Sequence, residues 1–402
     1  MKSPNPVPLP VDSKSRRSCL CSILPAASFL FLLFFIGSAF LVPDYREKVS
    51  RWRIADNFQN FKFGTCKNQC SPPGTEALPE GILSKTSNLQ MRPLWGFPKM
   101  DENSRNLFAV AVGIKQRDLI DKMVTKFLSS NFTIMLLHYD GIVDEWKDYE
   151  WNDHVIHVSA RNQTKWWFAK RFLHPDIVAE YGYIFLWDED LGVENFNPQQ
   201  YVSIVKSKGL EISQPALDIG KSEIHQQITA RMRKSLVHRR TFKPGLCDRN
   251  STAPPCTGWV EMMAPVFSRA AWRCVWYLIQ NDLIHAWGLD YRLGYCAQGD
   301  RLKNIGVVDA EYIVHYGRPT LGGTDEYKES SQSNAKDPSL EASSHPNKKD
   351  PRLEVRRQSY REFKIFFRRW ENAARDDKCW MDPYKDADKQ SMPSFHLSPR
   401  AV

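Results

Sequence analysis

Residues 181–197 read Tyr-Gly-Tyr-Ile-Phe-Leu-Trp-Asp-Glu-Asp-Leu-Gly-Val-Glu-Asn-Phe-Asn, an apolar run that stops at three consecutive acids. The run Tyr183 to Trp187 has the length and the aromatic content of a buried strand. If extended geometry continues past it, Asp188 and Asp190 share a face while Glu189 points away. The acids would then lie at the carboxyl end of a strand, where open α/β sheets bind ligands.

Two interpretations of the three acids stand. Asp188 and Asp190 together offer the oxygen ligands that Mg²⁺ or Mn²⁺ prefers, and such an ion completes its shell with substrate phosphates. Alternatively, acids after a strand form a solvated turn. Trp187 before the acids and Gly192 soon after them favour a packed, sharply turned strand end.

Strand and helix patterns alternate in the first half of the chain. Apolar runs predict strands at 107–113, 132–138, 154–159 and 183–187, and helical spacing predicts helices at 116–130 and 164–180, the second interrupted by Pro175. This alternation predicts an α/β domain with a mostly parallel sheet flanked by helices.

The second half is less regular. We expect helices at 199–207, 221–238 and 270–283, strands at 211–217, 259–267 and 305–308, and a disordered linker at 324–352. A helix at 353–374 has an apolar face that suits either packing on the domain or lying on a membrane.

An apolar segment of 24 residues, counted from Cys19 to Val42, is long enough to cross a bilayer, which takes about 20 residues. A cleavable signal peptide ending near Gly37-Ser38-Ala39 is the alternative, but the run exceeds the usual ~7–15 residues, which favours a signal anchor. Asn131, Asn162 and Asn250 begin glycosylation sequons, which are used only on the lumenal side.

Composition limits the classes of function. The net charge of +9 fits anionic small molecules or a membrane surface, but the basic residues are dispersed and no nucleic-acid motif accompanies them. Patterns of P-loop NTPases, classical dehydrogenases, zinc proteases and serine hydrolases are absent from the sequence.

Cys247 and Cys256 flank a Pro-rich loop, and Cys66 and Cys70 are close enough to pair, as in an oxidising lumen. A zinc site is the alternative for the second pair.

Several of these features resemble known families. The run Leu107 to Gly113, Asp140, the Trp-Asp-Glu-Asp run at 187–190 and His315 together resemble glycosyltransferases of the GT-A fold, whose Asp-x-Asp motif holds a divalent ion against a nucleotide-sugar diphosphate. Residues 105–317 more closely resemble a plant family of unknown function labelled lysine-ketoglutarate reductase trans-splicing-related. The shared runs are Phe-Leu-Trp-Asp-Glu-Asp at 185–190 and Thr-Gly-Trp-Val-Glu-Met at 257–262. That label implies no chemistry.

The GT-A resemblance implies roles for particular residues. Metal ligands would be Asp188, Asp190 and His315, and nucleotide-binding residues would be Asp140, Lys165 and Gly113. A satisfied histidine at a strand end and a turn-forming Asp-Gly pair are the alternatives for His315 and Asp140. Lys170 shares the phosphate hypothesis with Lys165, and a solvated helix face is the alternative for both.

An inverting enzyme of this kind needs a base to take the proton of the attacking hydroxyl. The resemblance places Asp290 near the acceptor, and Glu261 is the second candidate; a structural, helix-capping acid is the alternative for either. A retaining enzyme would need no such base.

The sequence therefore predicts a single-pass type II protein of the Golgi membrane that transfers sugar from a UDP- or GDP-sugar to a glycan or glycoconjugate with Mn²⁺ or Mg²⁺. The predicted division is a cytosolic tail (1–18), a transmembrane anchor (19–42), a stem (43–104), a GT-A-like catalytic domain (105–323), a linker (324–352) and a C-terminal helix and tail (353–402). A rival hypothesis is a non-catalytic glycan-binding or scaffolding protein with the same fold.

Overall fold

The computed structural model describes residues 71–85, 104–318 apart from residue 234, and 351–384. All of them belong to one compact unit, Ser71–Val402. The predicted anchor at 19–42 and the Cys66–Cys70 pair lie outside the described residues. Among the helices that are described, none is both long and apolar enough to cross a membrane.

The first four strands form the parallel half of the sheet, in the order β3-β2-β1-β4. They are β1 (Asn106–Val112), β2 (Phe132–His138), β3 (Ile156–Ser159) and β4 (Tyr183–Trp187), which confirms the four strands predicted from their apolar runs. The chain moves outward from β1 to β3 and then returns to the other side of β1. The carboxyl ends of β1 and β4 therefore meet at a topological switch point, where α/β sheets bind ligands.

The rest of the sheet is largely antiparallel, so the prediction of a mostly parallel sheet is wrong beyond β4. Next to β4 follow β8, β6, β9 and β5, and β7 pairs with the first part of β9, at residues 307–308. Of these pairings only β6 with β9 is parallel. The bounds are β5 Leu191–Gly192, β6 Ile212–Leu217, β7 Val237–His238, β8 Val266–Ser268 and β9 Ile305–His315. The described residues thus form a mixed α/β domain.

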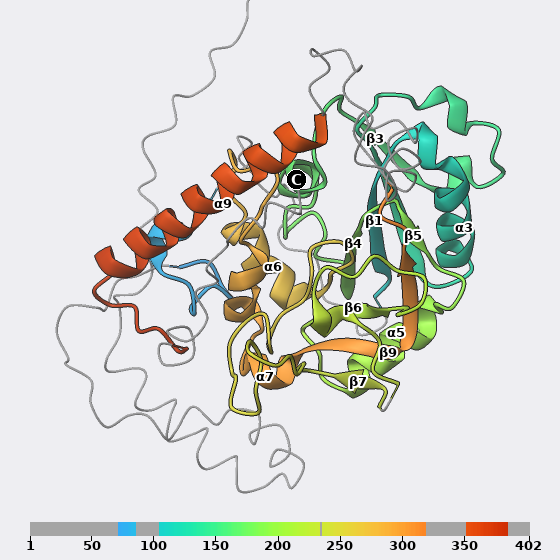
Figure 1. Cartoon of the computed structure of the whole chain (residues 1–402). Coiled ribbons are helices and arrows are strands. Elements are labelled where there is room, and N and C mark those ends of the chain that lie inside the picture. The colour runs from blue at the N-terminus through green and yellow to red at the C-terminus, as the bar shows by residue number, and fades with distance from the viewer. Residues whose placement is uncertain (1–70, 86–103, 234, 319–350, 385–402) are drawn as a thin grey trace, which may run out of the picture. The chain divides into compact units, whose positions relative to one another are not determined.

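Both faces of the central sheet are covered, because alternate residues of a strand face opposite sides. In β1, Leu107, Ala109 and Ala111 join one apolar cluster with α4 and α6, whereas Phe108 and Val110 join another with α3 and α5. Figure 1 shows α3 on one side of the strands and α6 on the other. The helices are α3 Arg117–Leu128, α4 Lys165–Phe172, α5 Pro198–Ser207, α6 Arg269–Leu278, α7 Arg301–Asn304 and α9 Pro351–Asp376.

Three predicted elements differ from the structure. The helix expected at 164–180 begins after Thr164, whose side chain caps it, but ends at Phe172, before Pro175. Residues 221–238 are not a helix; they contain only a short 3-10 turn at 227–229 and β7. The strand expected at 259–267 is reduced to β8. At 221–238, contacts of Val237 and His238 with β9 determine the conformation in place of local spacing. The residues of β8 pair with β4 and β6.

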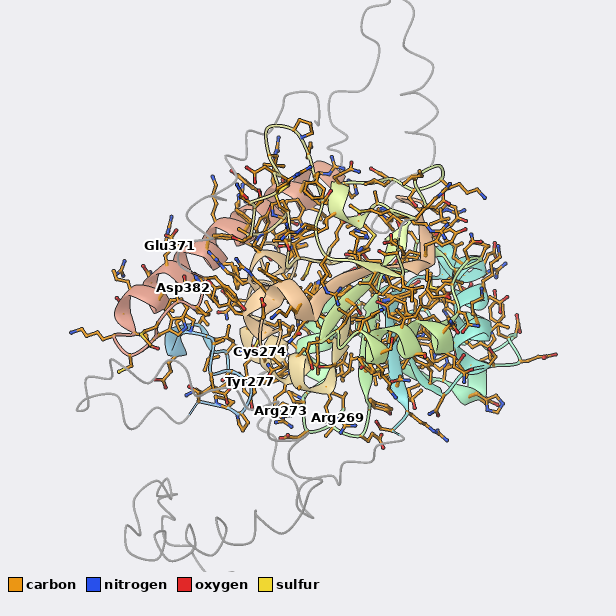
Figure 2. All side chains as sticks on the ribbon, turned by 90° about the horizontal axis from the view of Figure 1, so that it is seen from below. Arg269, Arg273, Cys274, Tyr277, Glu371 and Asp382 are labelled. Atoms are coloured by element: carbon orange, nitrogen blue, oxygen red, sulfur yellow. A yellow bond between two sulfur atoms is a disulfide. The ribbon has the colours of Figure 1, made fainter. Side chains whose placement is uncertain are left out.

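Helix α9 packs on the domain, which was one of the two alternatives for it. Phe366, Trp370 and Ala373 are buried in the cluster that contains α6. The short 3-10 helix η2 (Glu80–Ile82), within the range predicted as stem, lies against it, because a Cβ on Gly81 would stand 3.1 Å from the Cβ of Ala373. Figure 2 shows Glu371 on α9 and Asp382 after it, with Arg269, Arg273, Cys274 and Tyr277 along α6.

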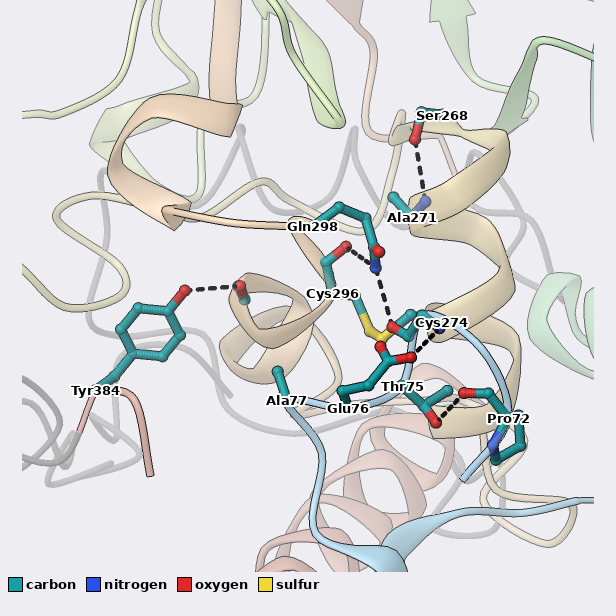
Figure 3. The surroundings of a disulfide bond; sticks show 12 residues. Pro72, Thr75, Glu76, Ala77, Ser268, Ala271, Cys274, Cys296, Gln298 and Tyr384 are labelled. Atoms are coloured by element: carbon teal, nitrogen blue, oxygen red, sulfur yellow. Dashed lines mark hydrogen bonds between the residues drawn. A yellow bond between two sulfur atoms is a disulfide. The ribbon is translucent and has the colours of Figure 1, made fainter. Parts of the chain in front are cut away.

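Two disulfides connect pairs of described residues in the irregular second half. Cys247 pairs with Cys256 across the Pro-rich loop, as their spacing suggested. Cys274 of α6 pairs with Cys296, a link that the sequence analysis did not foresee. Residues 72–77 pass beside this second disulfide, where Gln298 donates a hydrogen bond to the carbonyl of Gly74 (Figure 3).

Candidate functional site

Asp188 follows β4 directly and is fixed by its backbone and by its carboxylate. Its N–H donates to the carbonyl of Met263 (2.8 Å), and its Oδ1 lies 2.7 Å from the ammonium of Lys165. Lys165 also donates to the carbonyl of Met262 (2.6 Å), so it joins the end of β4 to residues 262–263. The side chain of Asp188 is 39% exposed. The surrounding protein nevertheless desolvates the carboxyl and raises its pKa, because this effect outweighs the opposing charge of Lys165.

Asp190 meets His315 because β5 pairs with the end of β9, with Leu191 opposite His315. The Nε2 of His315 lies 3.5 Å from Oδ2 of Asp190, and that oxygen also accepts the backbone N–H of Arg318. Burial alone would lower the pKa of His315, but the hydrogen bond and charge of Asp190 outweigh it and raise the pKa to about 9. The imidazole is therefore charged at neutral pH while this pair is intact.

Glu189 points away from the other two acids, as the alternation predicted. Its carboxyl is 1% exposed and accepts the backbone N–H of Gly113 (2.7 Å) and the hydroxyl of Tyr139. Burial raises its pKa to about 8 in spite of these donors. Glu189 thus ties the end of β4 to the ends of β1 and β2, a role that the sequence analysis did not assign.

Glu261 and Asp290 lie on loops that meet beside Asp188. Glu261 precedes the two residues whose carbonyls bind Lys165, and its Oε2 is buried without a hydrogen-bond partner. Trp259 lies two residues before Glu261, and Tyr291 directly follows Asp290. The centroids of these two rings are 6.4 Å apart. Burial raises the pKa of Glu261 to about 8, and His315, Asp290 and Asp188 are all close enough to act on it.

Asp290 begins the 3-10 helix η7 (Asp290–Cys296) and accepts the backbone N–H of Tyr291 (3.0 Å). Burial raises its pKa to about 7 against this hydrogen bond. A carboxyl with a pKa near neutrality can accept a proton and release it again, as general base catalysis requires.

The residues predicted to contact a nucleotide have structural partners. Both carboxylate oxygens of Asp140 accept backbone N–H groups, from Ile114 (2.7 Å) and Ile142 (2.9 Å), the arrangement of the turn-forming alternative. Lys165 is 7% exposed and bonded as described above, so it would have to leave Asp188 to reach a phosphate. Their roles toward a nucleotide stay predictions.

Lys170 lies elsewhere and is neither a phosphate ligand nor part of a solvated helix face in this structure. It is 3% exposed, donates to the carbonyls of Ser84 and Trp276 and stands over the Trp276 ring. Burial lowers its pKa to about 6.

The structure adds two residues that the sequence analysis missed. Residues 222–225 form a segment along the end of β9, where the carbonyl of Glu223 accepts from Nδ1 of His315 (2.8 Å). The His225 ring stands 5.5 Å from the His315 ring, and burial lowers the pKa of His225. The mistaken helix at 221–238 concealed them, although the Ser-Glu-Ile-His sequence at 222–225 carries two groups of the required chemistry.

The predicted metal ligands do not form a closed cage. Among the residues that the structure describes, no three His, Cys, Asp or Glu side chains stand close enough together to hold a metal ion. The donor set nevertheless fits Mg²⁺ or Mn²⁺, which proteins often hold by one or two carboxylates while phosphates and water supply the other ligands. Asp188 and Asp190 would serve as those carboxylates.

A pocket of about 390 Å³ lies away from this cluster. Its lining includes Lys126, Glu194, Phe196 and Glu311, and none of the predicted site residues.

Comparison with known proteins gives a family for the chain. The family profile described as "Protein of unknown function (DUF707)" matches residues 69–376. The chain belongs to this family. The match includes every predicted site residue, but neither a plant origin nor the trans-splicing label finds support in it. No curated protein matches the sequence.

Some solved structures are distantly similar. TarS 1–349 of S. aureus, solved alone and with UDP, has a TM-score of 0.34 and 10% identity, and the match covers 52% of this chain and 59% of TarS. The glycosyltransferase GlyE of Streptococcus pneumoniae TIGR4 gives a TM-score of 0.30 and 12% identity over 68% of this chain and 64% of GlyE. The chain thus spans about three fifths of these neighbours, and a similarity of this size carries no argument about its activity.

Proposed function

We propose that this chain is a glycosyltransferase of the GT-A kind that takes a sugar from a UDP- or GDP-sugar in the presence of Mn²⁺ or Mg²⁺. The observation that carries the proposal is the position of Asp188 and Asp190 at the end of β4, beside β1 at the switch point of the sheet, with His315 3.5 Å from Asp190. Ligands of α/β sheets bind at this place, and a diphosphate there needs a cation.

The charge of the cluster supports a bound cation. Five carboxyl groups lie in or beside this cluster, and Lys165 and His315 are the cationic partners of Asp188 and Asp190. The charge of Asp190 acts to raise the pKa of Asp188, and the charges of Asp290, Asp188 and Glu223 act to raise the pKa of Glu261. The five are Asp188, Asp190, Glu223, Glu261 and Asp290. A divalent ion would neutralise this excess and the charge that grows on the leaving diphosphate.

The proposed reaction needs a proton acceptor if it inverts configuration. The acceptor hydroxyl oxygen forms a bond to the anomeric carbon, its proton passes to the carboxylate of Asp290, and the bond from that carbon to the diphosphate oxygen breaks. The electron pair of the broken bond leaves with the nucleoside diphosphate. Glu261, whose Oε2 is buried without a hydrogen-bond partner, is the second candidate for this proton.

We further propose that the domain faces the Golgi lumen behind a membrane anchor at 19–42. The asparagines of all three sequons, Asn131, Asn162 and Asn250, are exposed, as glycosylation requires. The disulfides Cys247–Cys256 and Cys274–Cys296 fit an oxidising compartment. Together these features support a lumenal domain that acts on glycans or glycoconjugates.

The test is a screen of the full-length chain in detergent against a panel of UDP- and GDP-sugars, with and without Mn²⁺. We expect one donor to be hydrolysed or transferred only with the metal, and Asp188→Asn to abolish that turnover. Absence of turnover with every donor, together with glycan binding that ignores metal and nucleotide, would favour the non-catalytic rival.

A further inference from the structure

Residues 282–291, which we call the Asp290 loop, are held along their length by α9, a helix about 70 residues later in the chain. Glu362 of α9 accepts two hydrogen bonds from His285, from the backbone N–H (2.8 Å) and at Nδ1 (2.9 Å). The side chains of both residues are nearly buried, at 13% and 7% exposed. A buried carboxylate that accepts two hydrogen bonds holds its partner at a defined position.

The same helix packs on the glycine two residues before Asp290. Gly288 has φ +93°, and a Cβ there would stand 2.9–3.2 Å from ring atoms of Phe363, Phe366 and Phe367. Next to Asp290, the Tyr291 ring approaches Phe363 and Phe367 with centroids 6.4 and 6.1 Å apart. Aromatic side chains of α9 therefore limit the movement of the loop on both sides of Asp290.

The same helix also holds the start of the loop. The guanidinium of Arg369 binds the Asp282 carboxylate with two bonds of 2.6 Å. The helix thus contacts the Asp290 loop at its start, at His285 and on both sides of Asp290.

We infer that α9 is a part of the site itself and that Glu362 is a positioning residue, which acts through His285 to hold Asp290 against Glu261 and the end of β4. The inference rests on the proposed function and on Asp290 as the base. A base acts only within hydrogen-bond reach of the proton it takes, and a displacement of about 1 Å lowers a rate by about 100-fold. Neither Asp290 nor Glu261 has a regular strand to fix it, so the helix supplies that constraint.

The chain offers a matched control at the end of the same helix. Asp377, directly after α9, accepts the backbone N–H of Glu80 (3.0 Å), which joins the far end of the helix to η2. Glu362→Ala and Asp377→Ala each remove a carboxylate that anchors this helix, but only the first releases the Asp290 loop. Glu362→Gln keeps the size and one acceptor oxygen of the native side chain.

The experiment measures kcat and KM for donor and acceptor in the full-length chain and its three variants, with UDP and Mn²⁺ binding and amide exchange of residues 282–291 alongside. We expect Glu362→Ala to lower kcat for transfer by about 10- to 100-fold. Donor KM and UDP binding should change less than twofold, and exchange in the loop should rise. Glu362→Gln should recover most of the rate, and Asp377→Ala should stay within about twofold of the native kcat.

Equal kcat values for Glu362→Ala and Asp377→Ala, or unchanged exchange in the loop, would overturn the positioning role while leaving the proposed function in place. A native chain that neither binds UDP with Mn²⁺ nor transfers sugar would overturn the proposed function and this inference with it.

Discussion

The two sides of the candidate site are built in different ways. On the side of β1 and β4, Asp188, Glu189 and Asp190 follow a strand, and neighbouring strand ends hold them through backbone groups such as the Gly113 N–H. On the other side, Glu261 and Asp290 stand on loops that a disulfide and α9 hold from a distance. The first side depends on strand register, and the second depends on tertiary packing. Substitutions on the first side should therefore weaken UDP and Mn²⁺ binding, whereas substitutions on the second side should lower the rate of sugar transfer.

Removal of the Cys274–Cys296 disulfide should have the largest effect on stability and should separate the two sides most clearly. Replacing both cysteines by alanine should lower the free energy of unfolding by about 3 kcal/mol, because the link closes a loop in the unfolded chain. Both residues are 0% exposed, so the substitution also loosens the packing of α6 against η7. Sugar transfer should fall while UDP and Mn²⁺ binding persists at temperatures where the chain is folded.

Chemical denaturation and nucleotide binding of this double variant are the measurements. The pair Cys247→Ala and Cys256→Ala, which opens an exposed loop with a separation of 9 residues, is the control. A variant that lost nucleotide binding and transfer to the same extent would contradict the division into two sides.

A smaller effect is expected from a substitution on the side of β1 and β4, at Gly113. In Gly113→Ala the added Cβ would stand 2.6 Å from Cζ of Tyr139, whose hydroxyl is bound to the buried Glu189. The rigid ring has to move, which should lower the free energy of unfolding by about 2 kcal/mol. Because the loop after β1 moves with it, we expect UDP and Mn²⁺ binding to weaken.

Thermal unfolding with and without UDP and Mn²⁺ measures both effects. Gly220→Ala is the matched control, since the nearest atom to its Cβ would be Oδ1 of Asp218 at 3.5 Å, an ordinary contact. Native nucleotide binding in the Gly113 variant would show that the end of β1 does not contribute to the donor site.

A further effect concerns the pH dependence of stability. Glu261 has an ordinary pKa of 4.5, and burial in the folded chain raises it to about 8. Between these values the unfolded chain releases the proton and the folded chain keeps it, so Glu261 lowers stability as pH rises, by at most about 1.4 kcal/mol per unit. Glu261→Gln removes this loss.

The difference in unfolding free energy between Glu261→Gln and the native chain should therefore increase from pH 5 to pH 8, in the absence of metal. Glu145→Gln, at an exposed position, supplies the reference slope. A difference that stayed constant or decreased with pH would show that the Glu261 carboxyl ionises freely in the folded chain.

The contrast also explains what the sequence could predict. The strands β1, β2 and β4 follow from local apolar runs, because most of their residues are buried on both faces and need no distant information. The alternation of side chains correctly turned Glu189 away from Asp188 and Asp190. Both conclusions depend on the pattern of residues within a single segment.

The second half of the domain depends on contacts between distant residues. The segment 221–238 has helical spacing, but Val237 and His238 pair with β9, and the His238 ring forms a hydrogen bond with Asp309 (2.8 Å), so the segment is not a helix. Nothing in the sequence around Glu362 indicates its role, because its partner His285 lies 77 residues away. Asp290 and Glu261 were likewise candidates for the base only through a family resemblance, and the sequence did not indicate that they lie close together.

The most direct test of the central claim is the thermal unfolding of the full-length chain with UDP or GDP, with and without Mn²⁺. We predict that a nucleotide stabilises the chain only when Mn²⁺ is present, by about 2.7 kcal/mol at a concentration of 100 times its Kd. Asp190→Ala should abolish this stabilisation, and Asp153→Ala, at an exposed position, should leave it intact. Stabilisation that is independent of Mn²⁺, or that survives in Asp190→Ala, would contradict the account.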